Sequence, residues 1–106
     1  MSEDLKQVTP LQLKAWLAEG TPIELIDVRE VHEHEQFNIG GRLIPFNEIL
    51  NEAHTISRDK DVVLYCKIGI RSQIAMQRLQ EKFKFTNLIN LKGGIEAWKR
   101  TPGSTD

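Results

Sequence analysis

The sequence predicts an α/β domain with a central, mainly parallel sheet and helices on both faces. Short aliphatic runs alternate along the chain with segments whose apolar residues recur at helical spacing. Glycine, proline and polar residues separate the two kinds of segment. The chain has 106 residues, enough to bury one hydrophobic core. We therefore expect a single domain over residues 1–106, with a core from about residue 8 to 100 and a polar tail at 101–106.

The first half of the chain opens with a helix. Thr9 is a helix-capping residue, Pro10 suits the first helical turn, and Gly20 is typical of a helix end. The apolar residues between them recur at helical spacing: Leu13, Trp16 and Leu17. The segments that follow are predicted in order as a buried strand over 23–28, a short exposed helix over 29–36, a brief strand over 43–45 and a short helix over 46–50.

The second half has clearer boundaries. A strongly apolar strand over 62–65 leads into a loop over 66–71, and Ser72 is expected to cap the next helix. One face of that helix is apolar: Ala75, Met76, Leu79 and Phe83. A strand over 88–91, a turn at Gly93-Gly94 and a helix that begins at Ile95 complete the pattern. Ligands of such sheets bind beyond the carboxyl ends of the strands, where Cys66 lies in this prediction.

Composition excludes several classes of function. Lys and Arg number 14 against 15 Asp and Glu, and no dense basic patch suggests nucleic acid. The longest apolar run is far shorter than a membrane span, and the polar start of the chain is unlike a signal peptide. We therefore expect a cytoplasmic protein. Cys66 is the only cysteine, so the fold contains no internal disulfide, and another molecule must complete any chemistry that the thiol begins.

The loop that starts at Cys66 favours a bound anion. A thiol at the end of a strand and before a helix faces the unpaired N–H groups of that helix. Gly69 allows the loop to curl so that its N–H groups point inward, while Lys67 and Arg71 add positive charge. These features favour the reactive thiolate. The alternative is that Cys66 is a small buried apolar residue at the end of a core strand.

Three segments resemble the rhodanese-homology family. VVLYCKIGIRS (62–72) is similar to its active-site loop, LIDVRE (25–30) to its strand ending in Asp-Val-Arg, and LKGGIEAW (91–98) to its Gly-Gly-x-x-x-Trp turn and helix. They lie in the family's order, and the similarity as a whole spans about residues 8–100. The resemblance implies a rhodanese-like fold, with Cys66 as the nucleophile. It also implies that the rest of the loop binds substrate: Lys67, Ile68, Gly69, Ile70, Arg71 and Ser72.

The chain departs from the family pattern before the short strand. Many members carry Gly-His-Ile-x-Gly-Ala, whereas this chain reads Phe37-Asn38-Ile39-Gly40-Gly41-Arg42. The second glycine and Pro45 keep their places, so we expect the fold to be preserved. We expect the replaced residues to alter the packing behind the loop, where Arg42 is an unusual charge.

The resemblance implies transfer of sulfane sulfur through a persulfide on Cys66, from a donor such as thiosulfate to cyanide, a thiol or a carrier protein. No metal or organic cofactor is required. Sulfur-carrier or thioredoxin-like proteins are the expected protein partners. Similar domains also end proteins that activate ubiquitin-like sulfur carriers, which leaves a sulfur-relay module as an alternative function. A regulatory domain without activity usually lacks the cysteine.

Related phosphatases and arsenate reductases place five residues between their cysteine and arginine. Here four residues separate Cys66 from Arg71, which gives a tighter ring than a phosphoryl group needs. The loop also contains no carboxylate to serve as the general acid of a phosphatase. The sequence therefore favours sulfur over phosphate.

The roles of several other residues stay open or are expected to be structural. Arg71 either reaches into the site or turns back to an acidic residue such as Asp27, whose burial calls for a partner. The His32-Glu33-His34 run suggests a metal cluster, but its histidines point to different faces of a helix, and we expect an exposed helix instead. Trp16 and Trp98 are expected to pack in the core. Ile68 and Ile70 place apolar groups at the mouth of the loop, where a protein could dock.

Overall fold

The computed structural model describes residues 5–102. Five parallel strands form one sheet in the order β1-β5-β4-β2-β3. The strands are β1 (Gln7–Val8), β2 (Ile23–Asp27), β3 (Arg42–Leu43), β4 (Asp61–Tyr65) and β5 (Leu88–Leu91). The α-helices are α1 (Pro10–Glu19), α2 (Val31–Gln36), α3 (Ile70–Phe83) and α4 (Gly94–Arg100). Two short 3-10 helices, η1 (Phe46–Glu48) and η2 (Ala53–Thr55), follow β3.

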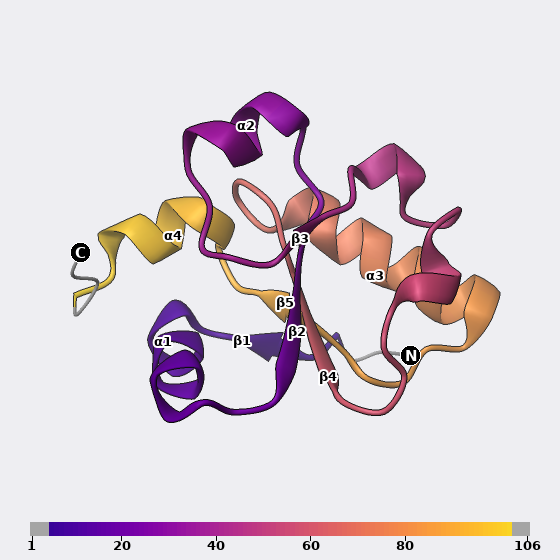
Figure 1. The fold of residues 1–106 in the computed structure, drawn as a ribbon, viewed down its shortest axis with the longest axis horizontal. Coiled ribbons are helices and arrows are strands. Elements are labelled where there is room, and N and C mark those ends of the chain that lie inside the picture. Colours follow the sequence, from indigo (N-terminus) through magenta and orange to yellow (C-terminus); the bar gives the residue numbers. More distant parts are fainter. Residues whose placement is uncertain (1–4, 103–106) are drawn as a thin grey trace.

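Helices cover both faces of the sheet, which confirms the predicted architecture (Figure 1). On one face α3, η1 and η2 pack against the sheet around Ile26, Leu64 and Leu79, all of them buried. On the other face α1 and α4 pack around Leu13, Val63 and Ile95, with Trp16 and Trp98 half-buried against them. Alternate residues of the central strands pack into the cores on the two faces of the sheet, because successive side chains of a strand point to opposite sides.

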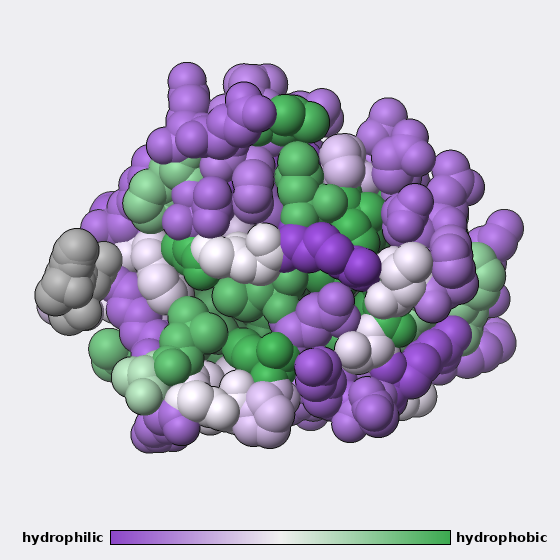
Figure 2. Space-filling model, in the orientation of Figure 1, coloured by the Kyte–Doolittle hydropathy of each residue, from purple (hydrophilic) through white to green (hydrophobic). Residues whose placement is uncertain are grey.

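Helix α2 lies above the carboxyl ends of the strands, where the loop between β4 and α3 also curls (Figure 1). Apolar surface gathers near the centre of this view and over α1, with hydrophilic surface around it (Figure 2). Leu11 and Leu17 are exposed on α1. Within residues 5–102, none of the helices combines the length and the apolar character that crossing a membrane requires.

The first helix follows its local signals. The Thr9 hydroxyl accepts a hydrogen bond from the Gln12 N–H at 3.1 Å, and the Gln12 side chain accepts one from the Thr9 N–H at 3.0 Å. Gly20 ends the helix in the left-handed conformation, with φ of 72°. Both predicted termini are confirmed, because a capping box and a glycine depend only on residues within one turn.

Other boundaries differ from the predictions. The strand predicted over 43–45 is the two-residue β3, and the helix predicted over 46–50 is the single 3-10 turn η1. Strand β1 and helix η2 were not predicted, because two or three residues carry no periodic signal. The predicted polar tail lies outside the described residues from position 103 onward.

The segment that departs from the family pattern joins α2 to β3. Gly41 has φ of 89°, and a Cβ atom there would lie 2.6 Å from the Leu25 Cβ, so this position requires glycine. The Tyr65 hydroxyl donates to the Gly40 carbonyl at 2.8 Å and fastens the segment to β4. Arg42 points away from the core, where its guanidinium lies 2.9 Å from the Thr55 hydroxyl and 3.4 Å from Glu24. The expected rhodanese-like arrangement therefore accommodates the departure.

Candidate active site

Cys66 follows the last residue of β4, and only 1% of its surface is exposed. Its sulfur accepts hydrogen bonds from the backbone N–H groups of Gly69 at 3.1 Å and Ser72 at 3.4 Å. Gly69, with φ of 97°, curls the loop back and is the N-cap of α3. The sulfur thus sits at the amino end of a 14-residue helix, where N–H groups lack helical partners and favour an anion.

The first turn of α4 holds the beginning of the loop. The Ile95 N–H donates to the Cys66 carbonyl at 2.9 Å, and the Glu96 N–H donates to the Lys67 carbonyl at 3.0 Å. Gly94 makes this approach possible: its φ is 62°, and a Cβ atom there would lie 2.5 Å from both carbonyl oxygens. Two sequence-distant segments, 66–67 and 94–96, are therefore fixed against each other by paired backbone groups.

Ser72 was predicted to cap α3, and this is wrong. The helix begins at Ile70, and Ser72 is a fully buried residue of its first turn. The Ser72 hydroxyl lies 3.3 Å from the Cys66 sulfur and donates to the Asn90 side-chain carbonyl at 2.6 Å. Gly69 takes the cap position because the loop needs a positive φ there, which a serine would adopt only with strain.

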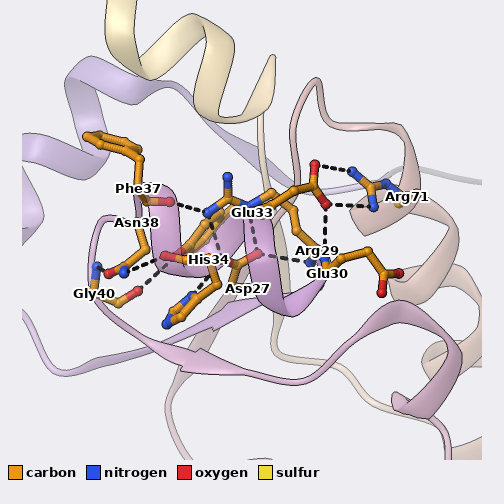
Figure 3. Close-up of polar contacts among 10 residues, drawn as sticks. Asp27, Arg29, Glu30, Glu33, His34, Phe37, Asn38, Gly40 and Arg71 are labelled. Carbon is orange, nitrogen blue, oxygen red and sulfur yellow. Dashed lines mark hydrogen bonds and ion pairs between the residues drawn. The ribbon is translucent and has the colours of Figure 1, made fainter.

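Arg71 pairs with Glu33 of α2, so the suggested partner Asp27 is wrong (Figure 3). Two guanidinium nitrogens of Arg71 lie 3.4 Å from the two carboxylate oxygens of Glu33, and both side chains are partly exposed. Burial acts to raise the pKa of Glu33, but the Glu30 N–H and Arg71 outweigh it and lower this pKa. Glu33 is therefore an ionised partner for a loop cation.

Asp27, at the end of β2, has Arg29 as its main partner (Figure 3). Arg29 donates from Nε to Oδ1 at 2.9 Å and from Nη2 to Oδ2 at 2.8 Å, and Asp27 is fully buried. Burial acts to raise the pKa of Asp27, yet hydrogen bonds from Arg29 and with His34 hold it below its ordinary value. Arg29 also donates to the Phe37 carbonyl, which ties β2 to the end of α2. The expected structural partner of Asp27 is confirmed.

The His32-Glu33-His34 run is only partly solvent-exposed. His32 is exposed, whereas Glu33 pairs with Arg71 and His34 Nδ1 lies 2.8 Å from Asp27 Oδ2. Within residues 5–102 the structure contains no group of three or more His, Cys, Asp or Glu placed to hold a metal ion. The run thus links α2 to the loop and to β2.

The surface around the loop is mixed in character. A pocket of about 380 Å³ opens between α2 and α4, and its lining includes three cations (Arg29, Lys67 and Lys99) and two carboxylates (Glu33 and Glu96). Ile68 and Ile70 are 53% and 57% exposed, as expected for apolar groups at the mouth of the loop. Charged side chains and exposed apolar side chains therefore both lie near the Cys66 loop.

Sequence reasoning missed Asn90, Glu33 and Gly94 as parts of the site. Asn90 had a usable signal, since it is the only polar residue of an otherwise aliphatic strand, and a buried amide requires partners. Gly94 stood in a recognised turn, but the sequence did not indicate which backbone it approaches. Glu33 lies 38 residues from Arg71, and its role follows only from the position of α2.

Comparisons with known proteins agree with this geometry. The family model of the rhodanese-like domain matches residues 9–101. The chain is 31% identical over 103 residues to a thiosulfate sulfurtransferase, GlpE, of Coxiella burnetii, covering 95% of this chain and 94% of the relative. It is 37% identical over 97 residues to a probable adenylyltransferase/sulfurtransferase, MoeZ, of Mycobacterium tuberculosis, covering 88% of this chain and 24% of the relative. The chain thus spans about a quarter of the length of the second relative.

Among solved structures, a rhodanese-like domain protein from Staphylococcus aureus superposes with a TM-score of 0.80 at 26% identity, covering 89% of this chain and 91% of that chain. The region matched by the family contains four of the five strands, β2 to β5, and the thiol loop that follows β4. The chain therefore belongs to the family of rhodanese-like domains.

Proposed function

We propose that this protein is a sulfurtransferase that carries sulfane sulfur as a persulfide on Cys66, with thiosulfate as a small-molecule donor. The observation that carries the proposal is that two backbone N–H groups, those of Gly69 and Ser72, donate hydrogen bonds to a buried sulfur. Such donors stabilise a thiolate and, after transfer, a persulfide anion. The similarity to GlpE of Coxiella burnetii, a thiosulfate sulfurtransferase, supports thiosulfate as the donor.

The first half-reaction is a displacement at sulfur. The Cys66 thiolate attacks the outer sulfur of thiosulfate, an S–S bond forms to Cys66, the S–S bond of thiosulfate breaks, and sulfite leaves with the electron pair. In the second half-reaction, cyanide or a thiolate attacks the outer sulfur of the persulfide, and the Cys66 thiolate leaves. Electrons and charge balance within each step, so neither an oxidant nor a cofactor is required. Ping-pong kinetics follow from the covalent intermediate.

The loop residues have distinct roles in this proposal. Gly69 and Ser72 contact the sulfur directly, while Lys67 and Arg71 supply positive charge for an anionic donor and for departing sulfite. Ile68 and Ile70 frame the entrance. Glu33 supports sulfur rather than phosphate chemistry, because its lowered pKa and its pairing with Arg71 make it a poor general acid.

A second candidate is a relay module that accepts persulfide sulfur from a protein and passes it to a sulfur-carrier or thioredoxin-like protein. The exposed Ile68 and Ile70 favour it, because they place apolar surface beside the nucleophile. The Mycobacterium relative, in which a matching region forms a quarter of a longer protein, also supports it. Both candidates require the Cys66 thiolate and differ in the donor.

The test is the intact mass of the reduced protein before and after incubation with thiosulfate. We expect the wild type to gain one sulfur atom, to lose it on addition of cyanide and to release thiocyanate. Cys66→Ser, which preserves the size of the side chain, should gain nothing. No gain in a wild type whose thiol still reacts with iodoacetamide would reject thiosulfate as donor and favour the relay module.

A further inference from the structure

Asn90 is a buried amide directly beneath the active-site loop. It lies in β5, beside Leu64 of β4 at the last pair of the register between these strands, and 1% of its surface is exposed. Leu88, two residues earlier, belongs to the core on the α3 side, so Asn90 also points toward α3. A polar side chain buried at this depth is stable only where its donors and acceptors find partners.

The partners of Asn90 fix the direction of its amide. Its Nδ2 lies 3.3 Å from the Gly69 carbonyl oxygen, which can only accept, and 3.3 Å from Gln7 Oε1. The nitrogen must therefore face Gly69, and Oδ1 faces the Ser72 hydroxyl at 2.6 Å. Because a carbonyl oxygen cannot donate, the Ser72 hydroxyl gives its single proton to Asn90.

This direction leaves the Ser72 hydroxyl unable to donate to sulfur at the same time. Its oxygen lies 3.3 Å from the Cys66 sulfur, so in the thiol state the S–H group can donate to it. Once Cys66 loses its proton, sulfur and Asn90 Oδ1 are two acceptors for one hydroxyl proton. The backbone N–H groups of Gly69 and Ser72 then remain as the committed donors to the sulfur anion.

We propose that Asn90 is a positioning residue that competes with the Cys66 sulfur for the Ser72 hydroxyl, and thereby limits how strongly the site favours the sulfur anion. The physical benefit is a sulfur that remains transferable, since a nucleophile or persulfide held by fewer donors is more reactive. Asn90 also holds the Gly69 carbonyl and so steadies the end of the loop. This inference deepens the proposed function and rests on it, because it concerns the same sulfur.

The charged groups around the hydrogen bonds of Cys66, Ser72 and Asn90 are the same in every variant compared below. They are Lys67 and Arg71 of the loop and α3, Glu33 of α2, Asp27 and Arg29 at the end of β2, and Glu96 of α4. None of them is changed by the substitutions, so a shift between variants reports the hydroxyl proton rather than a new charge.

The experiment measures the rate of Cys66 alkylation by iodoacetamide against pH, with no sulfur donor present. Asn90→Leu frees the Ser72 hydroxyl for the thiolate, and we expect the midpoint of the pH profile to fall by about one pH unit. Ser72→Ala alone should not raise the midpoint, because the hydroxyl gives its proton to Asn90 and the thiolate loses no donor. In the Ser72→Ala background, Asn90→Leu should produce no further fall in the midpoint.

Gln7→Leu is the matched control. It removes the contact between Asn90 Nδ2 and the Gln7 side chain but leaves the hydrogen bond from Ser72 to Asn90 Oδ1 in place, so the midpoint should not change. A rise of about one pH unit in Ser72→Ala would overturn the inference, since the hydroxyl would then already serve the thiolate. That result does not depend on whether Asn90→Leu folds. A shift in Asn90→Leu that persists without the Ser72 hydroxyl would overturn it as well. Alkylation needs no sulfur donor, so failure of the sulfurtransferase proposal is detected separately, by the mass measurement.

Discussion

Gly94→Ala should detach the active-site loop from α4. The new Cβ atom would lie 2.5 Å from the carbonyl oxygens of Cys66 and Lys67, whereas ordinary contact begins at 3.4 Å. The loop must therefore move by about 0.9 Å, the difference between those two distances. Hydrogen bonds of 2.9 Å from Ile95 and 3.0 Å from Glu96 to the same oxygens would be stretched beyond useful length.

The expected cost follows from these contacts. Forcing alanine to a φ of 62° costs about 1–2 kcal/mol, and two lost backbone hydrogen bonds add about 1 kcal/mol each. The free energy of unfolding should thus fall by about 3–4 kcal/mol, a large part of the stability of a small domain. A nucleophile displaced by about 1 Å can lose about a hundredfold in rate, and we expect a loss of that order in persulfide formation.

Gly20→Ala is the matched control, because Gly20 has a φ of 72° and a Cβ atom added there would meet nothing within 4 Å. It should cost only the backbone strain, about 1–2 kcal/mol, and leave the rate unchanged. Urea unfolding gives both free energies, and stopped assays of thiocyanate release give both rates. Equal losses of stability and activity in the two variants would refute the reasoning, since the close approach of Gly94 to the loop would then have no consequence.

Two further predictions concern the charged groups beside the loop. Because the folded-state pKa of Asp27 is lowered, its contribution to stability is present above the ordinary aspartate pKa and is lost as pH falls through the folded value, below about pH 4. Asp27→Asn should reduce this acid-side loss when the free energy of unfolding is measured in urea at several pH values. An unchanged dependence of the unfolding free energy on pH would contradict the pairing with Arg29. Glu33→Gln removes the charge that faces Arg71 and should lower the KM for thiosulfate several-fold while leaving the KM for a neutral organic trisulfide unchanged. The fall in KM should vanish when the same change is made in Arg71→Ala. An equal change of KM for both donors would show that Glu33 only braces the loop.

Much of the fold was predictable because its signals are local. Thr9 and Gly20 delimit α1 through contacts within one helical turn. Strands β4 and β5 appear in the sequence as largely apolar runs over 62–65 and 88–91, and their alternation with helices favours a parallel sheet. The two-residue strand β1 was not predictable, because its existence depends on pairing with β5, far along the chain.

The candidate site was likewise predictable only where it depends on residues adjacent in the chain. The position of Cys66 at the end of a strand, with a glycine in the loop and a helix after it, could be predicted from adjacent residues alone. The start of α3 could not, because serine is a common helix cap, and only the curl at Gly69 shows that Ser72 is instead buried against the sulfur. The choice of Glu33 over Asp27 as the partner of Arg71 depends on where α2 lies above the sheet.

The sequence by itself therefore determined the class of fold, the candidate nucleophile and the length of the loop around it, since each depends on residues that are neighbours in the chain. Only the tertiary structure decided which groups surround the sulfur. Asn90 is 18 residues from Ser72, Glu33 is 38 residues from Arg71, and the approach of Gly94 to Cys66 crosses from α4 to the end of β4. Contacts at such separations form when packed layers bring segments together, and no local pattern specifies which residues then meet.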